Sequence, residues 1–332
     1  MDWLTLSALG KPVWMWAAFL TVVVSLLALD LGVLHRKQKE IGARESLLLS
    51  GGYMAVGLGF GAWVWTELGR QAGLEYVTGF LVEKSLAMDN VFVIATIFAA
   101  FAVPRAYQHR VLFWGILGVI VLRAIMIGVG AALVAEFEWI LFAFAAFLVI
   151  AGLKMLRGGE AAADPKDNPV YRWLARRLRL TDGFEGSRFF VRRVPAGGSR
   201  TVLYATPLFL ALVMIELADV VFAVDSVPAI FAITTDPYIV YTSNIFAILG
   251  LRALYFALAA VTARFAYLKH ALAILLIFIG GKVFVAEAAG WEKFPAPVSL
   301  AITAAILAGG IVYSLWRTER SPPAPANQGP AA

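Results

Sequence analysis

The stretch MIELADVVFAVDSVP, residues 214–228, places three acids, Glu216, Asp219 and Asp225, in an otherwise apolar segment. The residues around it, from 203 to 233, are mainly Leu, Val, Ala, Phe and Ile, which is typical of a membrane-buried helix. A carboxylate in the hydrocarbon of a bilayer costs roughly 2.5–3.5 kcal/mol on insertion scales. Acids in such a segment therefore indicate a cation site, a proton relay or buried ion pairs.

The whole chain has the composition of a polytopic membrane protein. Of its 332 residues, 61% are hydrophobic and 15% are charged, whereas soluble domains are about 25% charged. A membrane-spanning helix needs roughly 20 apolar residues. The segments of this kind are 12–34, 47–66, 77–102, 109–134, 138–156, 202–232, 238–263, 270–290 and 298–316. We therefore expect an all-α fold, a polytopic membrane helical bundle of about nine transmembrane helices.

Lysine and arginine are unevenly distributed between alternate connections. One set of connections is basic, above all the 157–200 loop, whereas the other set holds only Lys11, Arg70 and Lys293. Because short cytoplasmic connections carry the excess of Lys and Arg, we expect the N-terminus outside and the C-terminus in the cytoplasm. No cleavable signal peptide is expected, because no basic segment precedes the first apolar run.

The 157–200 loop is the one sizeable polar part of the chain. Residues 170–180, VYRWLARRLRL, carry basic residues, aromatic residues and leucines at helical spacing. We expect this helix to lie on anionic lipid of the inner leaflet. Nucleic acid is not an expected partner, because membrane topology alone explains the basic residues. The Pro- and Ala-rich tail, 321–332, is expected to be disordered.

Polar residues recur in the same order in two sets of three spans. The matched residues are Glu83 with Asp219, Asp89-Asn90 with Asp225-Ser226, Arg123 with Arg252, and Lys154 with Lys282. A second register aligns Asp89 with Asp219 and needs almost no gap, so the register stays open. Because three is an odd number, the second set enters the membrane in the opposite sense. Such inverted repeats are an architecture of secondary transporters.

The repeat divides the chain into consecutive parts. These are two N-terminal transmembrane helices (1–76), a first three-helix repeat (77–156), the basic cytoplasmic loop (157–200), a second three-helix repeat (201–290), a C-terminal transmembrane helix (291–320) and the tail (321–332).

The charged residues inside the spans allow two interpretations. The acids are Asp30, Glu83, Asp89, Glu216, Asp219 and Asp225, and the bases are Lys84, Arg123, Lys154, Arg252 and Lys282. In the first interpretation they form buried salt bridges, because unpaired buried charge is strongly unfavourable. In the second, the carboxylates gather with the oxygens of Asn90 and Ser226 and bind a hard divalent cation, Mn²⁺, Mg²⁺ or Ca²⁺.

Gathering these acids needs more than one straight helix. Glu216 and Asp219 share a helix face, but acids six residues apart do not align on a straight helix. The hypothesis therefore requires a break near Pro228 or the convergence of the third and sixth spans. Carboxylates that bind a cation also bind protons, so proton antiport is a natural form of coupling for export against an inside-negative potential.

Several motifs resemble the TerC family of tellurium-resistance membrane proteins. They are EKSLAMDNVFV (83–93), ELADVVFAVDSVPAI (216–230), ALDLGV (28–33), RALYF (252–256) and Gly281-Lys282. The resemblance covers roughly residues 10–316. It implies an integral inner-membrane protein whose better-understood members export Mn²⁺ and are grouped with exporters of the LysE type.

The resemblance also implies the functional residues. The ion site would comprise Glu83, Asp89, Asn90, Glu216, Asp219 and Asp225, with Ser226 and Asp30 as further candidates. The charge-balancing residues would be Lys84, Arg123, Arg252 and Lys282. No permanently bound cofactor is expected, and Mn²⁺ would be the substrate.

Other function classes remain in view. The alternative is a membrane scaffold or assembly factor linked to tellurite or metal stress resistance, in which the acids would be structural. An enzyme is not expected, because the Gly-x-Gly-Asp signature of intramembrane aspartyl proteases is missing and the absence of cysteine excludes thiol chemistry. The sequence does not predict the oligomeric state.

Overall fold

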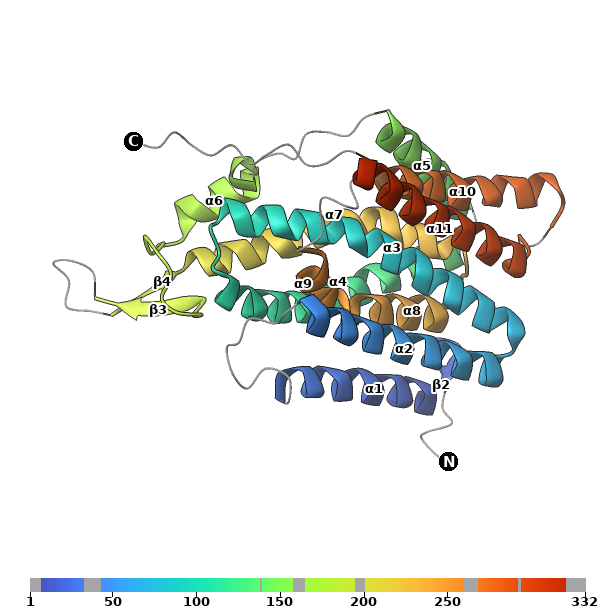
Figure 1. The fold of residues 1–332 in the computed structure, drawn as a ribbon. Coiled ribbons are helices and arrows are strands. Elements are labelled where there is room, and N and C mark those ends of the chain that lie inside the picture. Colours follow the sequence, from blue (N-terminus) through green and yellow to red (C-terminus); the bar gives the residue numbers. More distant parts are fainter. Residues whose placement is uncertain are drawn as a thin grey trace.

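The computed structural model describes residues 7–32, 43–137, 139–157, 165–194, 201–259, 268–291 and 294–320. It is a bundle of long helices, shown in Figure 1. The helices are α1 (Val13–Gly32), α2 (Ala43–Leu68), α3 (Arg70–Ala100), α4 (Arg105–Glu136), α5 (Trp139–Leu156), α6 (Pro169–Arg177), α7 (Pro207–Phe231), α8 (Pro237–Leu249), α9 (Leu251–Ala259), α10 (Leu268–Ala288) and α11 (Ala296–Arg320). The predicted all-α, polytopic membrane fold is confirmed.

Within the described ranges, 7 helical stretches are long and apolar enough to cross a membrane, and Pro237–Ala257, which runs through α8 and α9, is counted as one of them. Two of the expected spans are not among them. The apolar stretch of α1, Val13–Leu29, is shorter, and the 31-residue α3 carries several charged residues along its length. The count of nine spans therefore stays a prediction.

The packing of the helices agrees with an approximate two-fold axis that relates the two predicted repeats. Helix α3 packs along α8 and α4 packs along α7, while α5 packs on α10 and α3 packs on α7. These pairings are the ones required if α3–α5 correspond to α7–α10. The inverted repeat stays a prediction, and this packing agrees with it.

Helices α5 and α10 approach each other closely through two glycines. A Cβ atom on Gly152 of α5 would lie 2.6 Å from the carbonyl oxygen of Ala273, and one on Gly280 of α10 would lie 2.4 Å from the carbonyl oxygen of Ala145. Each glycine lies about two helical turns beyond the alanine of its own helix. The contact is therefore reciprocal, and small residues let the two backbones meet.

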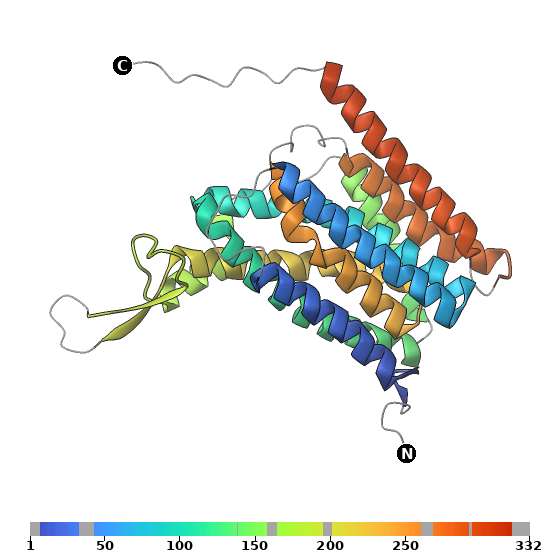
Figure 2. The same ribbon diagram turned by 60° about the horizontal axis from the view of Figure 1, so that its bottom comes forward.

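Helix α8 is enclosed by the bundle. Nearly all of its side chains from Tyr238 to Leu249 are buried, polar residues included. A helix that is apolar nearly all round is expected in the core of a bundle. Helices α1 and α11 lie at opposite edges, as Figure 2 shows from a second direction.

The two ends of the bundle carry different small elements (Figure 1). At one end, the strands β1 (Ser7–Ala8) and β2 (Lys11–Pro12) pair antiparallel beside α1. At the other end lie α6 and an antiparallel hairpin of β3 (Phe190–Arg193) and β4 (Val202–Ala205).

These elements change the expected boundaries of the second half of the chain. The sixth span does not begin at 202, because Val202–Ala205 pairs with β3 and the helix starts at Pro207. The helix expected over 170–180 ends at Arg177. The tail, 321–332, lies outside the described residues.

Candidate functional site

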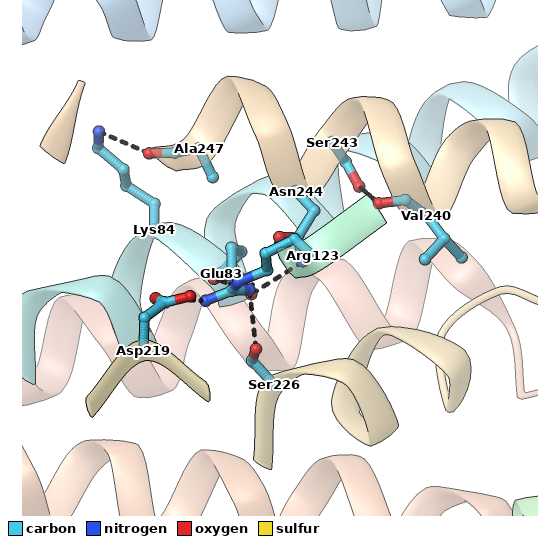
Figure 3. A network of polar contacts seen from close by, with 9 residues as sticks. All are labelled: Glu83, Lys84, Arg123, Asp219, Ser226, Val240, Ser243, Asn244 and Ala247. Atoms are coloured by element: carbon cyan, nitrogen blue, oxygen red, sulfur yellow. Dashed lines mark hydrogen bonds and ion pairs between the residues drawn. The ribbon is translucent and has the colours of Figure 1, made fainter. Parts of the chain in front are cut away.

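Arg123 lies at the centre of a buried polar network (Figure 3). Its Nη1 donates hydrogen bonds to Glu83 Oε1 at 2.6 Å, to Asn244 Oδ1 at 2.8 Å and to Ser226 Oγ at 2.9 Å. Its Nη2 is 3.5 Å from Asp219 Oδ1. Helices α3, α4, α7 and α8 each contribute to this network, so it joins both predicted repeats.

The network is charged and almost completely removed from solvent. The exposed fraction is 0% for Arg123, 2% for Glu83 and 6% for Asp219. A buried charge is tolerated when it is paired and hydrogen-bonded. Arg123 satisfies this condition for two carboxylates at once, which explains how α3 and α7 can present acids toward each other inside the bundle.

Asn244 completes the network, and sequence reasoning missed it. Its amide oxygen accepts from Arg123, and its Nδ2 donates to Glu83 Oε2 at 3.1 Å. Both oxygens of Glu83 are therefore bonded. The signal was present in the sequence, because Thr242-Ser243-Asn244 is a polar triplet within an apolar span.

Two carboxylate oxygens near the network have no hydrogen-bond partner among the described residues. They are Asp219 Oδ2 and Glu216 Oε2, both buried. A small cavity of about 20 Å³ has mostly apolar walls, in which Asn90, Asp219 and Arg252 are the polar side chains. This volume is enough for about one water-sized ligand. The spare oxygen of Asp219, which lines this cavity, is suited to a cation or a proton.

Glu216 is held against the glycine face of α4. A Cβ atom on Gly118 would lie 2.2 Å from Glu216 Oε1, and one on Gly115 would lie 3.8 Å from the same atom. The carboxylate thus occupies space that only glycine leaves open at residue 118. Glycine at this position lets Glu216 lie beside the same helix that carries Arg123.

Lys84 lies at a break between two helices. The expected span 238–263 is divided into α8 and α9 at Gly250, and Lys84 Nζ donates to the carbonyl oxygen of Ala247 at 3.1 Å. The cation therefore satisfies a carbonyl at the C-terminal end of α8, where positive charge is favourable. A Cβ atom on Gly250 would lie 2.7 Å from Lys84 Nζ, so a glycine leaves room for the ammonium.

The predicted charge-balancing residues have four different positions. Arg123 contacts Glu83 and Asp219, and Lys84 contacts a backbone carbonyl. Arg252 lines the small cavity with Asp219. Lys282 lies away from this network and donates to Ser299 Oγ at 3.0 Å.

The structure brings part of the predicted ion site together. Glu83, Asp219 and Ser226 meet at Arg123, while Asn90 shares the small cavity with Asp219. The side chains of Asp30, Asp89 and Asp225 lie outside the described residues. Within the described part of the chain, no three side chains of the His, Cys, Asp or Glu type are grouped as a metal site.

Comparison with known proteins gives consistent matches along nearly the whole chain. The family model described as "Integral membrane protein TerC family" matches residues 68–322. An uncharacterized membrane protein of Myxococcus xanthus, STKORF319, is 44% identical over 323 residues, which cover 97% of this chain and 98% of the relative. An uncharacterized membrane protein of Rickettsia felis is 46% identical over 302 residues, which cover 91% and 97%.

A further relative has a descriptive name. The Escherichia coli (strain K12) protein named "Putative membrane-bound redox modulator Alx" is 44% identical over 320 residues, which cover 94% of this chain and 97% of that protein. No solved structure matches this chain.

Proposed function

This chain belongs to the TerC family of integral membrane proteins, and on that premise we propose that it is a secondary transporter that exports a divalent metal cation, most favourably Mn²⁺. One observation carries the proposal. Buried carboxylates from α3 and α7 converge on one arginine, and Asp219 keeps an unbonded oxygen beside a small cavity.

The donor set favours a hard cation. Carboxylate oxygens of Glu83, Glu216 and Asp219, the amide of Asn90 and the hydroxyl of Ser226 lie in or beside the network. Oxygen ligands of these types suit Mn²⁺, Mg²⁺ and Ca²⁺. Asp30, Asp89 and Asp225 are further proposed ligands, and this part of the proposal rests on the sequence motifs alone.

Arg123 acts in this proposal as a tethered cation. Its guanidinium compensates the charges of Glu83 and Asp219 when no metal ion is bound. An incoming divalent cation competes for the same oxygens, so Arg123 must withdraw from at least one carboxylate before that carboxylate coordinates the metal. This exchange keeps the buried acids paired in both states, which avoids the large cost of an uncompensated buried charge.

The broken helix α8–α9 supports the same interpretation. Transporter sites are commonly built where a membrane helix is discontinuous, near the interface of two repeats. Here Asn244 precedes the break at Gly250 by less than two turns, and Lys84 neighbours Glu83 in sequence.

Proton antiport is the proposed form of coupling. An inside-negative potential opposes export of a cation by about 2.3 kcal/mol per charge per 100 mV, so export of a divalent ion needs an energy source. Carboxylates that release the metal can take up protons and carry them back. Flux of Mn²⁺ should then respond to an imposed pH gradient. Flux that does not change with the gradient would rule out proton coupling, but it would not rule out transport.

The proposed location is the bacterial inner membrane, with the basic end of the bundle facing the cytoplasm. Helix α6 carries Arg176 and Arg177 in its last turn and exposes Trp173. Exposed basic and aromatic side chains on one short helix are suited to the surface of an anionic leaflet.

A scaffold or assembly role is the second candidate. It is favoured by the extensive pairing of Arg123, which would make the acids structural. The name of the E. coli relative suggests a redox role, but this sequence contains no cysteine and offers no thiol chemistry of its own.

The test is manganese tolerance at native expression. Cells that carry Asp219→Asn should lose tolerance and accumulate manganese, while cells with Glu136→Gln, an exposed acid on α4, should match the wild type. Full tolerance with Asp219→Asn, in protein that is present at normal levels, would favour the scaffold.

A further inference from the structure

A second polar chamber lies apart from the Arg123 network. It has a volume of about 160 Å³ and is bordered by α3, α5, α10, α11 and the end of α7 with its connection to α8. It adjoins a wider, more open basin of about 500 Å³, because Gln71, Glu75, Thr234 and Thr235 line both spaces. The basin includes Lys11 of β2 and so opens toward the end of the bundle that carries β1 and β2.

Hydrogen-bond donors lie at the inner part of this chamber. Lys282 is 5% exposed, and its only hydrogen bond within the described residues is the one to Ser299 Oγ at 3.0 Å. An ammonium group has three N–H donors, and a hydroxyl that accepts a bond can still donate its own hydrogen. Lys282 and Ser299 therefore retain donors for an incoming oxygen, and neither residue lines the outer basin.

An acceptor group lies where the chamber meets the basin. Glu75 is 6% exposed and accepts a hydrogen bond from Gln71 Nε2 at 2.8 Å. A carboxylate can accept several bonds, so Glu75 retains capacity for a donor in the chamber. Glu287 of α10 also lines the chamber and is exposed. The chamber thus has a cationic donor pair at its inner part, and Glu75 with Glu287 supplies anionic acceptors on its outer side.

The remaining wall is largely apolar. Phe142, Phe231, Val283 and Trp291 contribute to it. The volume is below the roughly 300–1,000 Å³ of sites for drug-sized ligands, so the chamber suits a solute of only a few non-hydrogen atoms. Apolar walls can receive a short aliphatic group on that solute.

We propose that this chamber binds a small zwitterion of amino-acid size. Its carboxylate pairs with Lys282 and Ser299, and its ammonium group faces Glu75. A free anion would leave Glu75 facing the ligand's negative charge, and a free cation would face Lys282. The complementary order of charges along the chamber favours a molecule that carries both groups. This proposal does not depend on metal transport at Arg123.

The test is a binding measurement on the purified full-length protein in nanodiscs by isothermal titration calorimetry. The probes are glycine, alanine and leucine as zwitterions, acetate as the anion alone and methylamine as the cation alone. We expect at least one zwitterion to bind more tightly than both single-charge probes. Lys282→Met and Glu75→Gln should each weaken zwitterion binding by on the order of tenfold or more, the effect of losing one charge-assisted hydrogen bond.

Lys154→Met is the matched control. Lys154 is an exposed lysine near the C-terminal end of α5 and does not line the chamber, so its loss should leave binding unchanged. Glu75→Gln should also reduce the preference for alanine over acetate, a change that partial unfolding would not produce. No binding of any probe by the folded wild type would overturn the proposal. Equal affinities for acetate and alanine, or unchanged binding by both chamber variants, would overturn it as well.

Discussion

Arg123 Nη1 and Glu83 Oε1 are 2.6 Å apart, and both side chains are almost completely buried between helices of the two predicted repeats. This ion pair ties α4 to α3, while Asp219 ties the same guanidinium to α7. The pair therefore contributes to the packing of the bundle and occupies the oxygens that a transported cation would use.

Removal of the arginine should destabilise the protein. Arg123→Met leaves Glu83 and Asp219 buried without a counter-charge, which should lower the free energy of unfolding by about 3–5 kcal/mol. Denaturant unfolding in detergent micelles measures the change. The double variant Arg123→Met with Glu83→Gln should recover part of the loss, and additive losses would show that the pair is not coupled.

The glycine beside Glu216 should matter for transport. Gly118→Ala places a methyl group where the Glu216 carboxylate lies, so the carboxylate must move and Mn²⁺ flux should fall by about tenfold or more. Gly128→Ala is the matched control on the same helix, since a Cβ atom there meets nothing within 4 Å. Equal flux in the two variants would argue against a role for the position of Glu216.

The α5–α10 contact should be intolerant of side chains at two positions. Gly152→Ala and Gly280→Ala each bring a methyl group against a backbone carbonyl, so each should destabilise the fold by about 1–3 kcal/mol. Gly281→Ala, next in the chain and without neighbours within 4 Å, should be neutral or slightly stabilising. Thermal unfolding of the three variants compares them directly. Similar melting temperatures in all three would contradict the close approach.

Lys84 should stabilise the end of α8. Lys84→Met leaves the Ala247 carbonyl without its side-chain donor, which should lower the free energy of unfolding by about 1–3 kcal/mol. Hydrogen exchange should show faster exchange of amides around Gly250 than in the wild type. Lys154→Met, which removes an exposed lysine from α5, provides the comparison. Unchanged hydrogen exchange in Lys84→Met would show that Lys84 does not stabilise the end of α8.

The orientation in the membrane can be tested with single cysteines, because the chain has none of its own. A membrane-impermeant thiol reagent applied to intact spheroplasts should label Leu9→Cys, beside β1, and spare Val194→Cys, beside β3. Both positions are exposed. Labelling of Val194→Cys alone would reverse the proposed topology.

The sequence predicted the class of the fold and part of the site. Long apolar runs interrupted by a few acids identify membrane helices, because only a satisfied charge is tolerated there. The motifs around Glu83 and Asp219 identified the family, which the comparisons confirm. The structure brings these two acids to Arg123, one of the residues that the sequence predicted to balance their charge.

Other features could not be read from local sequence. At the break near Gly250, the Ala247 carbonyl accepts a hydrogen bond from Lys84, which lies on another helix and far away in the chain. The residues of β4, Val202–Ala205, were expected to begin a membrane span, but they pair with β3 and form a hairpin. Lys282 was expected near the acids, yet its position on α10 directs it to the chamber with Ser299. Each depends on long-range packing, which periodicity does not encode.

Transport of a divalent cation by the buried carboxylates of α3 and α7 is tested most directly by Mn²⁺ flux into proteoliposomes. The flux is measured under an imposed pH gradient with an internal manganese-quenched dye. The wild type and Glu136→Gln should show gradient-dependent flux, and Asp219→Asn, folded and incorporated to the same level, should show less than about a tenth of it. Flux through Asp219→Asn equal to that of the wild type, or no flux through the wild type, would contradict the account.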